Sequence, residues 1–93
     1  MNITALFPGS FDPFTAGHLN ILCRALTMFD KVVVAIGINQ DKSGFFSNEQ
    51  KRDIILQAVS GMDNVEVIEY DGLTVDVCRE RNIRHIVRGV RNM

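Results

Sequence analysis

Residues 8–18 read PGSFDPFTAGH, a stretch that joins a short apolar run to a helix-like pattern. A strand over 3–7 thus leads into a loop with Gly9, where the backbone can approach a ligand closely, and the loop leads into a helix N-terminus. Backbone N–H groups and the positive end of the helix dipole make such a junction a site for phosphate. His18 adds a hydrogen-bond donor or a charge. An ordinary turning connection is the alternative, but two glycines, the Ser10 hydroxyl and a histidine in one loop favour phosphate binding.

The rest of the chain alternates between strand-like and helix-like segments. Apolar residues at helical spacing predict a helix over 17–29, and a β-branched run predicts a strand covered on both faces over 31–38. Ser47 and Gln50 have the spacing of a capping box, which begins a helix that ends near Gly61. The remaining predicted elements are a strand over 65–69, a helix over 73–81 and a strand over 84–88. This order predicts an α/β fold, a Rossmann-like open parallel sheet of about four strands and three helices with right-handed crossovers.

Composition indicates one globular domain. The chain has 93 residues, 46% of them apolar and 23% charged, with a formal net charge of -1. This near-zero charge argues against a general nucleic-acid binder. No segment has the pattern of a signal peptide or a membrane span, which predicts a cytoplasmic protein without a membrane partner. Cys23 and Cys78 lie in helix-like segments beside apolar residues, so we expect two reduced core cysteines rather than a disulfide.

Polar residues follow each of the four predicted strands. In parallel α/β sheets ligands bind beyond the carboxyl ends of the strands, so these residues should share one edge. The four groups are residues 8–18, 40–42, 71–74 and 88–91. Thr74, in the third group, is interpreted by itself as an N-cap or first-turn residue. Residues 91–93 follow the last strand where a further helix would cover the sheet, so we expect one poorly covered face and more chain in the natural protein.

Several side chains at this edge suit a polyanionic ligand. The Ser10 hydroxyl and the His18 ring can donate hydrogen bonds to one phosphate oxygen. Lys42 supplies a flexible charge, and Arg88 and Arg91 supply planar guanidinium groups. Taken alone, Ser10 is equally a turn residue that bonds its own backbone, whereas Lys42 taken alone is interpreted as a solvated loop lysine. The sequence shows no serine elbow and no loop cysteine, which favours chemistry by positioning and charge stabilisation.

Other residues near this edge are predicted to be structural. Phe11 and Phe14 should be apolar plugs under the loop, which Asp12 and Pro13 shape. His85 lies within the fourth strand and is interpreted as structural. The arginines assigned to a solvated face are Arg79, Arg81 and Arg84.

The TAGH motif at residues 15–18 resembles the (H/T)xGH signature of the nucleotidylyltransferase superfamily. The PGSFDP run before it and RGVRN at 88–92 are similar to the bacterial phosphopantetheine adenylyltransferase family, and the similarity covers all 93 residues. The four-residue motif alone is only moderately specific for the family. Together with the preceding loop, Lys42 and the RGVR ending it is strong evidence for the resemblance. The resemblance implies the nucleotidylyltransferase fold and transfer of the adenylyl group of ATP to 4′-phosphopantetheine. It further implies dephospho-coenzyme A and pyrophosphate as products, and Mg²⁺ held mainly by the substrate phosphates.

The resemblance also implies roles for individual positions. His18 would stabilise the charge that develops at the α-phosphate during in-line attack. The implied ATP-binding residues are Ser10, Phe11, His18, Gly89, Val90 and Arg91. The implied residues for phosphopantetheine are Ser10, Lys42, Thr74 and Arg88. The family assembles as homo-hexamers, and no protein ligand for magnesium is implied.

The chain departs from the family pattern in two ways. Ser10 stands where many members have threonine, which keeps the hydroxyl. Members continue beyond position 93 with an acidic residue and a serine-rich segment that help to hold ATP, so residues 1–93 are expected to be the N-terminal part of a longer single domain. Two alternatives stay open. One is another member of the superfamily, such as a cytidylyltransferase or a nicotinate-nucleotide adenylyltransferase, against which Thr15 and the RGVRN ending argue. The other is an inactive nucleotide-binding fragment.

Overall fold

Four parallel strands form one sheet in the order β3-β2-β1-β4 in the computed structural model, which describes residues 3–38 and 46–88. The strands are β1 (Thr4–Gly9), β2 (Lys31–Gly37), β3 (Val65–Tyr70) and β4 (His85–Ile86). The helices are α1 (Ala16–Ala25), α2 (Asn48–Ala58) and α3 (Thr74–Arg81). The predicted α/β class, with its strict alternation of strands and helices, is confirmed.

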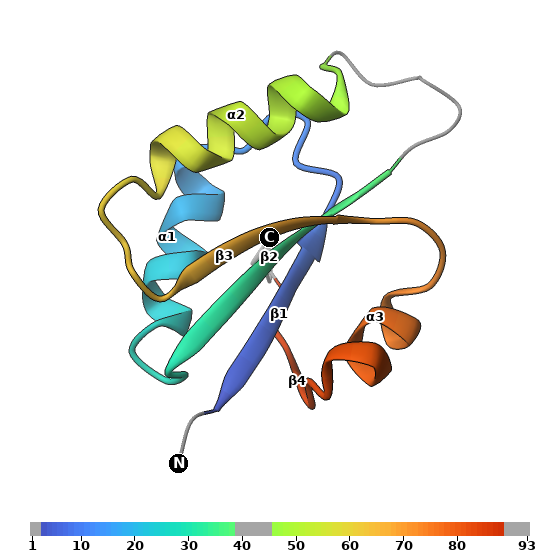
Figure 1. Cartoon of the computed structure of the whole chain (residues 1–93). Helices are drawn as coiled ribbons and strands as arrows, with labels where there is room; N and C mark the ends of the chain where they lie inside the picture. The colour runs from blue at the N-terminus through green and yellow to red at the C-terminus, as the bar shows by residue number, and fades with distance from the viewer. Residues whose placement is uncertain (1–2, 39–45, 89–93) are drawn as a thin grey trace, which may run out of the picture.

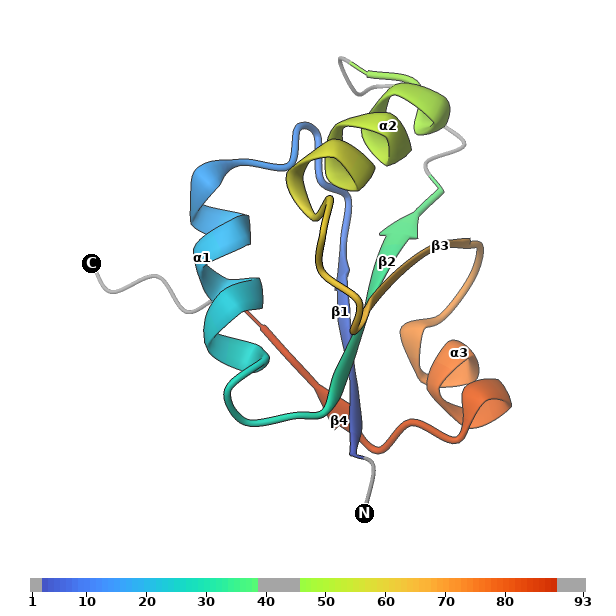
Figure 2. The ribbon, with the colours of Figure 1, turned by 60° about the vertical axis from the view of Figure 1, so that its left-hand side comes forward.

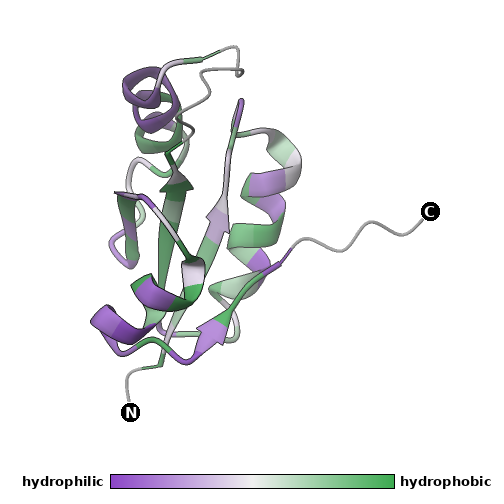
Figure 3. Cartoon of the chain, turned by 90° about the vertical axis from the view of Figure 1, so that its right-hand side faces the viewer, coloured by the Kyte–Doolittle hydropathy of each residue, from purple (hydrophilic) through white to green (hydrophobic). Residues whose placement is uncertain are grey.

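The central strand β2 is covered on both faces, as its β-branched run predicts. Val32, Val34 and Ile36 point into a core shared with α1 and α2. Val33 and Ala35 point the other way, into a smaller core shared with α3. Figure 2 shows α1 and α2 on one side of the sheet and α3 on the other. Figure 3 shows apolar residues concentrated in the strands, while α2 and α3 carry broad hydrophilic surfaces.

The first helix is shorter than predicted. It ends at Ala25, four residues before the predicted end at 29. The Thr27 hydroxyl donates to the Arg24 carbonyl at 2.6 Å, and the chain then turns into β2. The turn is anchored at Asp30, whose carboxylate accepts the Ile3 N–H at 2.7 Å. This return to the start of β1 requires the helix to stop early.

Two further boundaries differ from expectation. β1 extends through Gly9, so the loop begins only at Ser10. β4 is limited to two residues, His85 and Ile86, both exposed. The His85 ring packs against Phe29 with centroids 5.3 Å apart and a tilt of 41°, in keeping with a structural role.

One cysteine prediction is wrong. Cys78 is buried on α3, but Cys23 is exposed. The buried stripe of α1 contains Leu22 and Ala25, and Cys23 lies one position after Leu22, about 100° around the helix. An apolar neighbour in sequence therefore does not place a helical residue in the core. Both thiols are free, as expected.

Coverage of the sheet is incomplete around β4. Within the described part of the chain, α3 is the one helix on its face of the sheet, and the Ile86 side chain in β4 is 41% exposed. On the opposite face an apolar hollow of about 250 Å³ lies between α1 and β4, where Ile21, Ala25 and Phe29 meet Ile86 and Val87. Among the described residues no helix is long and apolar enough to cross a membrane.

A charged cluster lies far from the carboxyl edge of the sheet. Glu66 in β3 contacts Lys31 Nζ at 2.8 Å and Arg81 Nη1 at 3.1 Å. The hydrogen bond from Lys31, aided by Arg81, lowers the pKa of the Glu66 carboxyl below its ordinary value. The cluster joins the start of β2 to the end of α3, so Arg81, predicted to be simply solvated, is exposed but paired.

Candidate active site

The carboxyl ends of β1, β2 and β3 meet at one edge of the sheet, as predicted for a parallel arrangement. Gly9 pairs with Ile36, and Gly37 pairs with Tyr70. From this edge the loop after β1 runs past α2 and turns into α1 (Figure 1). The loop and the first turn of α1 therefore stand above the sheet, at the place where α/β proteins bind ligands.

Two phenylalanines anchor the loop, as expected. Phe11 and Phe14 are 3% and 7% exposed, and their ring centroids are 5.5 Å apart. Phe11 adopts a φ of 48°, which non-glycine residues rarely take. Its ring also packs edge-on against Phe7, with centroids 5.2 Å apart. Burial of this ring holds the backbone in its unusual conformation.

Gly9 has a packing role that the sequence does not reveal. A Cβ placed on Gly9 would lie 3.1 Å from the Phe11 ring. The missing side chain thus makes room for Phe11, in addition to any approach of a ligand. The glycine and the phenylalanine act together to shape the loop.

The loop is also tied to the start of α2. The Phe46 N–H donates to Asp12 Oδ1 at 2.9 Å, across 34 positions of sequence. Asp12 precedes a cis peptide bond to Pro13. The predicted loop-shaping role of Asp12 therefore has a specific partner. Ser47, the residue after Phe46, forms the predicted capping box of α2 with Gln50.

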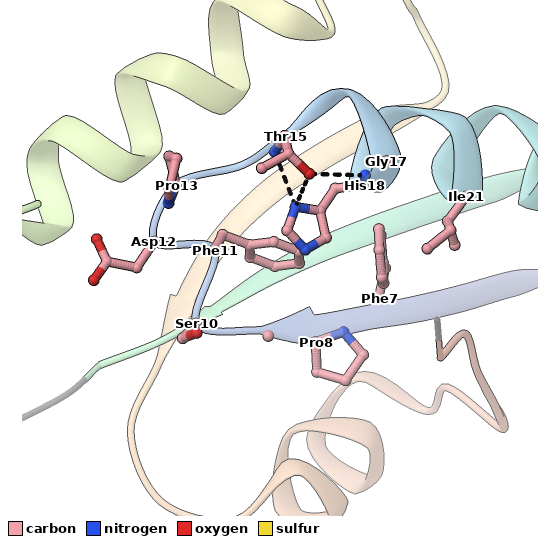
Figure 4. Close-up of a pocket in the computed structure, with 11 residues that line it drawn as sticks. Phe7, Pro8, Ser10, Phe11, Asp12, Pro13, Thr15, Gly17, His18 and Ile21 are labelled. Carbon is pink, nitrogen blue, oxygen red and sulfur yellow. Dashed lines mark hydrogen bonds between the residues drawn. The ribbon is translucent and has the colours of Figure 1, made fainter. Parts of the chain in front are cut away.

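His18 lies in the first turn of α1 and is held by Thr15. The Thr15 N–H donates to His18 Nδ1 at 2.9 Å, and Thr15 Oγ1 lies 3.1 Å from the same nitrogen (Figure 4). The Thr15 hydroxyl also accepts the His18 N–H at 3.4 Å. The imidazole stands among aromatic rings, with centroids 5.1 Å from Phe11 and 5.4 Å from Phe14. The ring is thus bonded at Nδ1 and packed against two aromatic rings.

A pocket of about 670 Å³ opens in front of His18 (Figure 4). Its lining consists of residues 7–13 together with Thr15, Gly17, His18 and Ile21. Ser10 is exposed, whereas the Phe11 side chain is buried. Three predicted residues, Ser10, Phe11 and His18, are therefore brought together in one pocket. Its volume is in the range of small-molecule sites.

The other predicted residues do not line this pocket or lie outside the described residues. Thr74 is the first residue of α3, so its first-turn interpretation is correct, and its Oγ1 lies 3.1 Å from the Tyr70 hydroxyl. Arg88 is exposed just after β4. Lys42 and residues 89–91 fall outside the described ranges.

Sequence reasoning used Thr15 only as part of the TAGH motif and assigned no role to Tyr70. Thr15 and His18 have the same spacing as Ser47 and Gln50, so a capping box was detectable there with histidine at its third helical position. Tyr70 carries no such signal. The Tyr70 hydroxyl reaches Thr74 only because β3 and α3 meet at this edge. A Cβ added to Gly37 would lie 3.5 Å from the same hydroxyl.

A family model described as cytidylyltransferase-like matches residues 6–93. The chain belongs to this cytidylyltransferase-like family. The match includes the whole pocket loop, His18 and the last described strand. The family match therefore includes the residues that line the pocket.

Named relatives of this cytidylyltransferase-like chain are longer than it is. A phosphopantetheine adenylyltransferase of Clostridium tetani is 53% identical over 93 residues, which are 100% of this chain and 58% of the relative. Proteins of the same name from Leuconostoc citreum and Leptospira biflexa are 54% and 44% identical, over 95% and 98% of this chain and 56% and 57% of their own length. The chain thus spans somewhat more than half the length of these relatives.

A solved structure supports the same fold. A bifunctional NMN adenylyltransferase/ADP ribose pyrophosphatase from Francisella tularensis matches with a TM-score of 0.64 and 30% identity. The match covers 88% of this cytidylyltransferase-like chain and 26% of the other.

Proposed function

We propose that this chain is the N-terminal part of a phosphopantetheine adenylyltransferase domain, with residues 1–93 contributing to a single domain. The observation that carries the proposal is the place of His18, at the N-terminus of α1 and in a pocket of about 670 Å³ that Ser10 also lines. A helix N-terminus favours phosphate groups, and a ring N–H can donate to them. Relatives with this activity in their names match along the whole pocket loop.

In the proposed reaction, a 4′-phosphate oxygen of phosphopantetheine attacks the α-phosphorus of ATP. The bond from that phosphorus to the oxygen bridging to the β-phosphate breaks, and pyrophosphate leaves with the electron pair. Dephospho-coenzyme A is the other product. His18 donates a hydrogen bond to the α-phosphate as its charge grows, which lowers the barrier without a protein nucleophile.

The remaining predicted contacts complete the proposal. Ser10, Phe11 and residues 89–91 bind ATP together with His18. Ser10, Lys42, Thr74 and Arg88 bind the acceptor, whose phosphate the two cations orient for attack. The proposed whole protein is a cytoplasmic homo-oligomer.

Magnesium is part of the proposed reaction, bound to oxygens of the substrate phosphates. Within residues 3–38 and 46–88, no group of three His, Cys, Asp or Glu side chains is placed to hold a metal ion. These residues do not fit a protein-held ion, and no step is assigned to one. When bound, the ion would neutralise phosphate charge.

A pyrophosphate-release assay on the full-length gene product tests the proposal. ATP should support turnover with phosphopantetheine, and nicotinamide mononucleotide or nicotinate mononucleotide should not replace it. Turnover with a mononucleotide acceptor alone would instead favour an activity like that named for the Francisella protein. Turnover only with CTP would favour a cytidylyltransferase. Running the 93-residue chain in parallel tests whether it is active alone or an inactive nucleotide-binding fragment.

Arg88 offers a specific check on the acceptor. Arg88→Ala should raise KM for phosphopantetheine by about tenfold or more, since a hydrogen bond to a charged group contributes ~1.5–3 kcal/mol. Arg84→Ala is the matched control, because Arg84 is also exposed and precedes β4. Equal effects of the two substitutions would contradict a phosphate contact by Arg88.

A further inference from the structure

The first turn of α1 is capped by the histidine of the TAGH motif. Thr15 is the N-cap residue, and both hydrogen bonds of a capping box join it to His18. Glutamate or glutamine usually occupies the third helical position of such a box. Here an imidazole does so, and the same side chain lines the pocket. One residue therefore caps the helix and faces the ligand space.

The bond to Thr15 selects one neutral form of the imidazole. A ring nitrogen accepts a hydrogen bond only through its lone pair, so Nδ1 carries no proton while the Thr15 N–H donates to it at 2.9 Å. The proton of the neutral ring then resides on Nε2, which lies on the side of the ring away from Thr15 (Figure 4). Turning the ring by half a rotation would put a carbon in place of Nδ1. The same bond thus fixes the orientation of the ring.

The surroundings of the imidazole are mostly aromatic. The rings of Phe11 and Phe14 lie 5.1 and 5.4 Å away, and the ring of Phe7, in β1, lies 6.3 Å away. Asp12 is the other titratable side chain among the described residues that line the pocket. Its Oδ1 accepts the Phe46 N–H, which directs that oxygen toward α2. The Thr15 backbone N–H, 2.9 Å from Nδ1, is therefore the contact that bears on the protonation of this nitrogen.

We propose that Thr15 is a positioning residue that holds His18 as a neutral imidazole with the proton on Nε2. The direction of this donor toward an α-phosphate rests on the proposed function, whereas the tautomer does not. A proton gained on Nδ1 breaks the capping bond, so the charge of His18 and the first turn of α1 are coupled. His18 acts as a neutral hydrogen-bond donor rather than as a cation.

Nuclear magnetic resonance of the ¹⁵N-labelled protein tests the tautomer without any substrate. At a pH where imidazoles are neutral, His18 should show Nε2 in the protonated range and Nδ1 in the unprotonated range. A scalar coupling should also connect the Thr15 amide nitrogen to His18 Nδ1 through the hydrogen bond. The exposed His85 serves as the internal reference, with shifts averaged between tautomers. Averaged shifts at His18, or a proton on Nδ1, would overturn the proposal.

Substitutions at Thr15 test the positioning role through activity. Thr15→Val keeps the backbone N–H but removes the hydroxyl that lies 3.1 Å from Nδ1 and accepts the His18 N–H, so the first turn no longer fixes that N–H against the ring; kcat should fall about fivefold with KM for ATP within twofold. Thr15→Ser should restore kcat, which a general loss of stability would not explain. A valine variant as active as the serine variant would overturn the positioning role. If the protein has no adenylyltransferase activity while the tautomer is as stated, only the proposed function fails.

Discussion

The His18 side chain both caps α1 and lines the pocket, and substitutions can separate these two roles. Glutamine at the third helical position keeps a capping box, whereas alanine removes it. We expect His18→Ala to lower the free energy of unfolding by about 1 kcal/mol and His18→Gln to lower it by less than half as much. Both should reduce pyrophosphate release at least about a hundredfold. Urea denaturation and the assay measure the two effects, and turnover retained by His18→Gln would refute the role in catalysis.

Gly9 and Gly17 flank the pocket and should respond in opposite ways to alanine. A Cβ on Gly9 meets the buried Phe11 ring at 3.1 Å, so Gly9→Ala should destabilise the fold by about 1–2 kcal/mol. Gly17 lies within α1, where the nearest atom to a Cβ is Thr15 Oγ1 at 3.5 Å. Gly17→Ala should therefore stabilise the fold by about 0.5–1 kcal/mol. Thermal and urea unfolding check both, and a neutral Gly9→Ala would show that Phe11 can shift freely.

At the scale of elements, the hydroxyl pair of Tyr70 and Thr74 joins the end of β3 to the start of α3. Tyr70→Phe removes one hydroxyl of a pair 3.1 Å apart and leaves Thr74 Oγ1 free to rotate. If Thr74 contacts the acceptor, Tyr70→Phe and Thr74→Val should each raise KM for phosphopantetheine by about threefold to tenfold, with kcat within twofold.

A double-mutant cycle distinguishes a coupled pair of hydroxyls from two hydroxyls that act independently on the acceptor. The combined Tyr70→Phe and Thr74→Val protein should lose little more than either single variant, because the two hydroxyls act as a unit. Losses that simply add would contradict the coupling. KM for ATP provides the internal control, since the pair lies on a different element from His18.

At the scale of the whole molecule, the Glu66 cluster makes stability depend on pH. The pKa of Glu66 is lower in the folded chain than its ordinary value of 4.5. Its contribution is therefore present above pH 4.5 and is lost as pH falls through the folded pKa. Because the side chains are 36–46% exposed, the contribution should be only about 0.2–1 kcal/mol and should shrink in high salt.

Glu66→Gln should accordingly reduce the loss of unfolding free energy between neutral pH and pH 3. Glu80→Gln is the matched control, since Glu80 is exposed on α3 and has no ion pair within the described residues. Urea unfolding across this pH range measures the difference. Identical pH profiles for the two variants would contradict a stabilising role of the cluster.

Periodicity made most of the fold predictable. The β-branched run at 31–38 predicted β2 because a buried strand needs apolar side chains on both faces. Ser47 and Gln50 predicted the start of α2 because capping is a local interaction. Contacts between distant segments set the rest. The early end of α1 depends on Asp30 meeting Ile3, which no local pattern contains.

The candidate site was predictable to a similar degree. Ser10 and His18 follow from a loop at a helix N-terminus, Phe11 was expected as an apolar plug beneath it, and the three residues share one pocket. The need for Gly9 depends on a ring two residues away that folds back on it, and the partner of Asp12 lies 34 positions along the chain. Such requirements exist only once the chain has folded.

The strand order β3-β2-β1-β4 has a consequence for how this architecture can diverge. From β1 the chain passes through α1 to β2 on one side, and α3 later brings it back to β4 on the other side (Figure 2). Such a reversal opens a crevice at the carboxyl end of the first strand, between connections that leave for opposite faces. The loop between Gly9 and His18 lines one side of this crevice. Because residues 10–14 of this loop take no part in the strand pairing, they can be exchanged to suit a different ligand while the sheet that positions them stays unchanged.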